Sequence, residues 1–86
     1  PTPVVAVNAA VAQSFAESPE SALASLDKLD GADHWHLYHV ARADCLDRMG
    51  HRPEALAALD RALAADLNEA DRLILEERRR SFLEDR

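Results

Sequence analysis

Apolar residues recur along the chain at helical spacing in five separate segments. In residues 3–16, Val4, Val7, Val11 and Phe15 return every three to four positions, which predicts an amphipathic helix with these side chains in the core. The pattern as a whole predicts an all-α chain of five helices. The later apolar stripes are Ala22, Leu26 and Leu29; Tyr38, Ala41, Cys45 and Met49; Leu56, Leu59 and Leu63, flanked by Ala55 and Ala62; and Ile74, Leu75 and Phe82.

Helix-capping residues, prolines and glycines separate these segments. Ser, Thr, Asp and Asn stabilise helix N-termini, proline is tolerated in the first turn, and glycine commonly ends a helix. Residues of each kind stand at the expected boundaries. The expected caps are Thr2, Ser18, Asp33 and Asn68, the helix-opening prolines are Pro3, Pro19 and Pro53, and the terminating glycines are Gly31 and Gly50.

The sequence also repeats itself at an interval of 33 to 34 residues. The segment SALASLDKLD at 21–30 returns as EALAALDRAL at 54–63. A helix pair that recurs about every 34 residues has the tetratricopeptide period. One hairpin leaves an apolar face uncovered, whereas two stacked hairpins bury it and a last helix covers the exposed end. We therefore expect a single tetratricopeptide-like domain over 1–86, with repeat units at about 3–32 and 33–67 and a capping helix at about 69–84.

Composition narrows the class of protein. The chain has 86 residues, 48% of them apolar, which suits one small globular domain. Its net charge of −6 disfavours a nucleic-acid module. No apolar run approaches the roughly 20 residues needed to cross a bilayer, and the single Cys45 cannot form an internal disulfide. We expect a cytoplasmic protein without membrane contact and, because Met does not open the sequence, a piece of a longer chain.

Four motifs, taken in order, resemble a known bacterial family. They are Pro-Val-Val-Ala-x-Asn at 3–8, His-x-x-His-x-Ala-Arg-Ala-Asp at 36–44, Leu-x-x-x-Gly at 46–50 and Asn-Glu-Ala-x-Arg at 68–72. This series is similar to the C-terminal extension of extracytoplasmic-function RNA polymerase sigma factors. In that family a tetratricopeptide-like domain follows two sigma domains, which bind DNA and the polymerase core.

The resemblance implies a regulatory or protein-interaction domain in transcription initiation. The implied partners are proteins: the sigma domains in cis, RNA polymerase or a regulatory protein. Neither sigma domain is in the chain, so we expect no direct contact with nucleic acid, and Ala9 stands where the family usually has Arg. The helical pattern alone leaves two alternatives, a stand-alone tetratricopeptide adaptor with an unrelated partner and a helical module that forms a homodimer.

No combination of residues indicates an enzyme, a cofactor or a metal site. His36 and His39 share a helix face and imidazole suits zinc, but no thiol or carboxylate at the right spacing completes a site. Packing roles are favoured for both histidines, and an inert buried thiol is favoured for Cys45. A nucleophilic cysteine needs an adjacent base and an orienting group, which the pattern does not supply.

A few polar and aromatic residues are candidates for partner or interdomain contacts. Asn8 is a poor helix former, so we expect its side chain to bond a neighbouring helix or loop. Trp35 is expected in the core rather than at an exposed contact. The candidate set is Asn8, Trp35, His36, His39, Arg42, Asp44 and Arg78.

The charged members of this set also have local explanations. Asp44 stands one helical turn before Arg48, a spacing at which an ion pair is worth only about 0.3–0.5 kcal/mol. Arg78 is expected to snorkel or to meet Asp71, two turns back. The positions that bind carboxylate tails in other tetratricopeptide grooves are apolar or acidic here, which disfavours an anionic ligand. These positions are Ala6, Ala10, Val40 and Asp44.

Overall fold

A computed structural model describes residues 3–33 and 35–84, and side chains from Val5 onward. The expected cap Thr2 and the side chain of Val4 lie outside this described part. The described residues form five α-helices and no strand, which confirms the predicted all-α class. The helices are α1 (Pro3–Ala16), α2 (Pro19–Asp27), α3 (His36–Arg48), α4 (Arg52–Leu63) and α5 (Glu69–Glu84).

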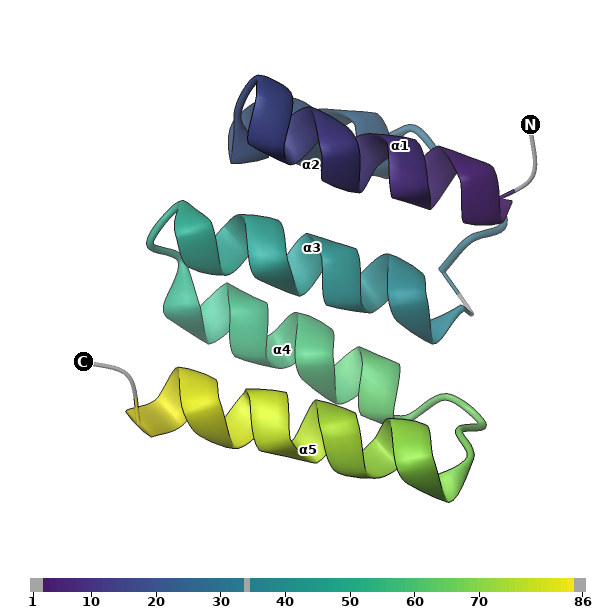
Figure 1. Ribbon diagram of the computed structural model, residues 1–86, viewed down its shortest axis with the longest axis vertical. Helices are drawn as coiled ribbons and strands as arrows, with labels where there is room; N and C mark the ends of the chain where they lie inside the picture. The colour runs from purple at the N-terminus through teal and green to yellow at the C-terminus, as the bar shows by residue number, and fades with distance from the viewer. Residues whose placement is uncertain (1–2, 34, 85–86) are drawn as a thin grey trace.

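The helices are stacked as two hairpins and a fifth helix. Helix α1 packs along α2, and α3 packs along α4; contacts of α3 with α2 and α1 join the hairpins, and α5 packs on α4 (Figure 1). The molecule measures 30 × 29 × 17 Å, and its short dimension accommodates two layers of helices. This is the expected tetratricopeptide-like stack.

Two side-chain caps form as the sequence predicts. The Ser21 backbone N–H donates to the Ser18 hydroxyl at 3.0 Å, and Pro19 occupies the first turn of α2. The Asp71 N–H donates to the Asn68 side-chain oxygen at 2.7 Å, at the start of α5. Each bond satisfies a backbone donor that has no partner within its helix.

Gly50 ends α3 as expected. Its φ of +84° lies in the left-handed region that glycine adopts at low cost. The His51 N–H donates to the Leu46 carbonyl at 2.8 Å, and the Gly50 N–H donates to the Asp47 carbonyl at 3.0 Å. This pair of bonds is the Schellman arrangement, and it turns the chain directly into α4.

The loop between α2 and α3 differs from the prediction. Helix α2 ends at Asp27, so Gly31, with φ of +76°, lies in the loop and does not end the helix. Helix α3 begins after Trp35, which makes no side-chain cap, so the prediction of an Asp33 cap is wrong. The reason is that the ring nitrogen Nε2 of His39, on α3, bonds the Asp33 backbone carbonyl and holds the loop against the helix.

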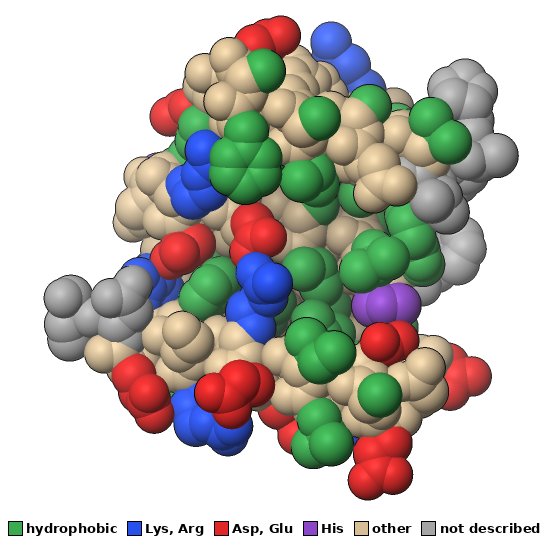
Figure 2. All heavy atoms as spheres, viewed as in Figure 1, with side chains coloured by type: hydrophobic (Ala, Val, Ile, Leu, Met, Phe, Trp, Pro, Cys, Tyr) green, Lys and Arg blue, Asp and Glu red, His purple; other side chains and the backbone are tan. Residues whose placement is uncertain are grey.

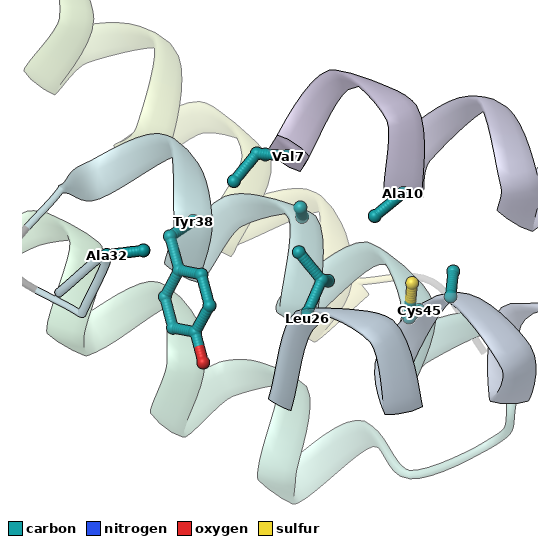
Figure 3. Packing of buried hydrophobic residues seen from close by; sticks show 8 residues of the cluster. Val7, Ala10, Leu26, Ala32, Tyr38 and Cys45 are labelled. Atoms are coloured by element: carbon teal, nitrogen blue, oxygen red, sulfur yellow. The ribbon is translucent and has the colours of Figure 1, made fainter. Parts of the chain in front are cut away.

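The core consists of two groups of buried side chains. Figure 3 shows the first, in which Val7 and Ala10 of α1 face Leu26 of α2 and, from α3, Tyr38 and Cys45. The second joins α3 and α4 to Phe82 of α5. Small residues dominate both groups, because helix backbones approach closely where side chains are short. The alanines of these groups with no exposed surface are Ala22, Ala43 and Ala55, and Ala62 of α4 is buried to the same degree.

Several large apolar residues that the pattern placed in the core lie on the surface. Val11 is 39% exposed, Phe15 is 77% exposed and Ile74 is 61% exposed, so their predicted burial is wrong. In α1 the smaller Ala10 and Ser14 are buried instead. The Ser14 hydroxyl donates to the Val11 carbonyl at 2.7 Å, which allows a polar side chain at this position.

The outer side of α5 is polar where the equivalent side of α3 is apolar. Thirty-four residues after the buried Ala43 and Leu46 come Glu77 and Arg80, which are exposed and form an ion pair. Charged side chains at these positions remove the apolar surface on which another helix would stack. Helix α5 therefore has the sequence of a capping helix.

Replacing Leu26 with alanine is expected to lower the free energy of unfolding by about 2–5 kcal/mol, because the side chain is fully buried and its truncation leaves a cavity. Leu73→Ala is the matched control: this leucine is 60% exposed, and the change should cost less than about 0.5 kcal/mol. Urea denaturation followed by circular dichroism measures both. Equal losses would contradict the assignment of the core.

Candidate protein-interaction surface

Helices α1, α3 and α5 contribute to one apolar face. We call the surface formed by Val11, Phe15, Leu37, Val40 and Ile74 the groove face. Leu37 is 43% exposed, and the exposure of Phe15 and Ile74 is greater still. Figure 2 shows hydrophobic side chains gathered over these helices, with acidic and basic side chains between them. The repeat architecture explains the arrangement, since alternate helices of the stack lie on the same side.

Two hollows lie within the groove face. The first, of about 240 Å³, is bounded by α1, α2 and α3, and the second, of about 210 Å³, lies between α3 and α5. Both are lined mainly by apolar side chains with a few charged groups at the edge. The first is lined chiefly by Val11, Phe15, Leu26, Ala41 and Cys45, together with the charged Asp44, Asp47 and Arg48, and the second by His36, Leu37, Val40, Asp71, Ile74 and Arg78.

An ion pair stands between the two hollows. The Arg78 Nη1 lies 2.6 Å from the Asp44 Oδ1, joining α5 to α3. The expected contact of Arg78 with Asp71 is therefore wrong, and Asp44 pairs across the groove rather than with Arg48 on its own helix. Both side chains remain about 40% exposed, at 39% for Arg78 and 43% for Asp44, so the pair contributes modestly to stability.

Arg48 lies at one end of the groove face. It donates to the Ser14 hydroxyl at 2.9 Å and to the Ser14 carbonyl at 3.1 Å, and its guanidinium stands 4.7 Å from the centre of the Phe15 ring. Stacking on the arginine fixes the exposed phenylalanine in place. No carboxylate among the described residues pairs with Arg48, which keeps its positive charge available at this end.

A carboxylate lies at the opposite end. The Asp71 Oδ2 is 3.9 Å from the His36 Nε2, and histidine supplies a charge only when it is protonated. The Asp71 side chain is 42% exposed. No Lys or Arg of the described part pairs with it, so its negative charge faces solvent beside the second hollow.

Three of the sequence candidates lie elsewhere. Arg42 forms an ion pair with Asp27 and stands 6.0 Å from the Tyr38 ring centre, so it ties α3 to α2. Trp35 is half-buried and packs against the first core group, close to expectation. Asn8 is exposed and its side chain makes no hydrogen bond to a described residue, so the predicted bond to a neighbouring helix or loop is wrong.

Among the residues that the structure describes, the histidines and the cysteine do not form a metal site. His39 is buried and bonds the Asp33 carbonyl, whereas His36 faces Asp71. Within residues 3–33 and 35–84, no group of three or more His, Cys, Asp and Glu side chains is arranged to hold a metal ion. Cys45 is 3% exposed, and burial raises the pKa of its thiol, so the reactive thiolate is disfavoured.

Asp44 has a perturbed carboxyl group. Burial raises its pKa above the ordinary value of 3.8, and the adjacent Arg78 guanidinium opposes this shift. The net shift is upward because removal of water from the carboxylate outweighs the attraction of the arginine. The ion pair therefore weakens the effect of burial without cancelling it.

Sequence reasoning missed Ser14, Arg48 and Phe15 as parts of the surface. The period of the repeat contains a signal that could have found some of these contacts. Ser14 and Arg48 are 34 residues apart, and so are Asp44 and Arg78. Each contact therefore joins a residue to the residue that stands one repeat period later in the sequence. A search for helical pairs one turn apart cannot detect them.

Comparison with known proteins identified one informative relative. The chain is 40% identical over 72 residues to an uncharacterized protein of Rhizobium meliloti (strain 1021). The match covers 83% of this chain and 17% of the relative, so the chain spans less than a fifth of that protein's length. No family model and no solved structure matches the chain. None of the helices formed by the described residues combines the length and apolarity that a bilayer crossing requires.

We expect NMR titration of the Asp44 carboxyl to give a pKa above 3.8, and a higher value still in Arg78→Met, which removes the opposing cation. Because a raised pKa favours the protonated folded state, stability from this group is full below the unfolded-state pKa and is lost as pH rises through the folded-state pKa. Asp44→Asn should lack this loss. A pKa that falls in Arg78→Met would contradict the assignment.

Proposed function

We propose that this chain is a protein-interaction domain that binds its partner through the groove face. The observation that carries the proposal is the exposure of Phe15, Leu37 and Ile74 on one side of the stack. Contiguous apolar surface of this kind marks interaction sites on small proteins, since water contact with it is unfavourable. The two hollows give a partner's apolar side chains places to insert.

We propose further that the domain is the C-terminal regulatory domain of an extracytoplasmic-function sigma factor, acting in the cytoplasm during transcription initiation. The motifs at 3–8, 36–44, 46–50 and 68–72 support this assignment through their resemblance to that family. The greater length of the Rhizobium relative is consistent with a helical stack that works within a longer protein. The partner would then be the sigma domains in cis, RNA polymerase or a regulatory protein.

The genomic reading frame upstream of Pro1 tests the sigma assignment. Two helical sigma domains encoded in the same frame would support it, and a different domain there would overturn it. The polypeptide encoded upstream also serves as the probe for binding, because a domain that acts in cis should bind it when the two are produced separately.

Ile74→Glu is expected to weaken binding of that upstream polypeptide at least tenfold, by placing a charge in the apolar second hollow. Leu73→Glu is the matched control, since Leu73 is equally exposed and adjacent on α5 but lines neither hollow. Isothermal titration calorimetry measures both, and the control should change the affinity less than twofold, roughly. Equal effects would show that binding does not use the groove face.

A further inference from the structure

The charges at the ends of the groove face give it a direction. Arg48, without a carboxylate partner in the described part, stands at the C-terminal end of α3 beside the first hollow. Asp71, without a Lys or Arg partner there, stands at the N-terminal end of α3 beside the second hollow. The two carboxylates that also line the first hollow are neutralised, Asp44 by Arg78 and Asp47 by Arg52. The face is thus positive at one end, apolar in the middle and negative at the other.

We infer that the groove face binds one amphipathic α-helix of a partner protein, lying obliquely across α3 and antiparallel to it. An acidic side chain near the N-terminus of this helix pairs with Arg48, and a basic side chain near its C-terminus pairs with Asp71. Apolar side chains between them enter the two hollows. This inference rests on the proposed interaction function and names the chemistry of the partner.

The charge order that a helix prefers selects the antiparallel direction. Acidic residues stabilise a helix at its N-terminus and basic residues stabilise it at its C-terminus, because of the helix dipole. A helix with this charge order meets Arg48 with its acidic end and Asp71 with its basic end only when it runs antiparallel to α3. The ends of its backbone dipole, each equivalent to about half a unit charge, then lie beside groove charges of the same sign, but the full charges of the two side chains outweigh them.

Dimensions are consistent with a short helix. From His36 to Arg48, α3 rises by about 18 Å, so a partner helix spans the two charged ends with residues about eleven to twelve positions apart. Between them, positions three to four apart present apolar side chains on one face. Such a helix needs four turns or fewer and fits the 30 Å width of the molecule.

A displayed peptide library tests the direction. The library is an alanine-rich helix with randomised apolar residues on one face and Glu or Lys at two positions about eleven residues apart. Selection on the 86-residue chain is expected to enrich Glu-first over Lys-first sequences about tenfold, since a Lys-first helix makes the two attractive contacts only in the parallel direction, with charges that its own dipole disfavours. The double variant Arg48→Glu with Asp71→Lys should reverse the preference.

Thermal unfolding establishes that each variant is folded before selection. If the double variant is unfolded, the single variant Asp71→Lys replaces it. This single variant should lose only the preference for a C-terminal Lys. Apolar enrichment without a charge order would overturn the inferred direction and leave the proposed function standing. If selection on the parent chain enriches no more peptides than selection on the Ile74→Glu chain, the inference is overturned. If the parent chain also fails to bind the upstream polypeptide, the proposed function is overturned. A dimer in sedimentation that Ile74→Glu dissociates would assign the face to a second copy instead.

Discussion

Close packing of helices at fully buried alanines is the constraint on which the rest of the structure depends. Ala22, Ala43, Ala55 and Ala62 have no exposed surface, whereas the large side chains buried to that degree in the described part of the chain are Leu26 and Leu59. Longer side chains at the alanine positions would hold the helices apart, because protein interiors are packed too densely to absorb extra methylene groups. The short contacts keep α3 between the two neighbouring helices α2 and α4, and so place α1, α3 and α5 on one side of the stack (Figure 1).

The apolar groove face is a consequence of this small-residue core. A chain of 86 residues buries a limited share of its surface, and here much of the buried share belongs to alanines. Larger apolar side chains such as Phe15 and Ile74 are left at the surface, where they line hollows between alternate helices. Arg48 at one end of the groove face has no carboxylate partner in the described part of the chain, and Asp71 at the other end has no Lys or Arg partner there. This difference in charge between the two ends gives the surface its direction. Fold, exposure and charge are thus the features on which the proposed binding of a protein helix rests.

The sequence predicted the architecture better than it predicted the surface. Helical spacing, the Ser18 and Asn68 caps and Gly50 located the helices because these signals are local. The burial of Val7 in α1 is confirmed, but that of Val11 and Phe15 was predicted wrongly, because hydrophobicity favours these residues whereas close packing favours the smaller Ala10 and Ser14. The Asp44–Arg78 pair was missed because its partners are 34 residues apart, and only the folded repeat brings them together. Contacts between residues far apart in the sequence also determine which charged side chains stay unpaired. The charge difference between the two ends of the groove face could therefore not be derived from local sequence patterns.

The most direct test of the account compares Ala55→Leu with Ala57→Leu by urea denaturation. Both alanines lie on α4, but Ala55 has no exposed surface and Ala57 is exposed. If close helix approach holds the stack together, Ala55→Leu should lower the free energy of unfolding by about 1–3 kcal/mol, since the added side chain overpacks the core. Ala57→Leu should change it by less than about 0.5 kcal/mol. An Ala55→Leu chain as stable as the parent would contradict the claim that these short contacts determine the fold.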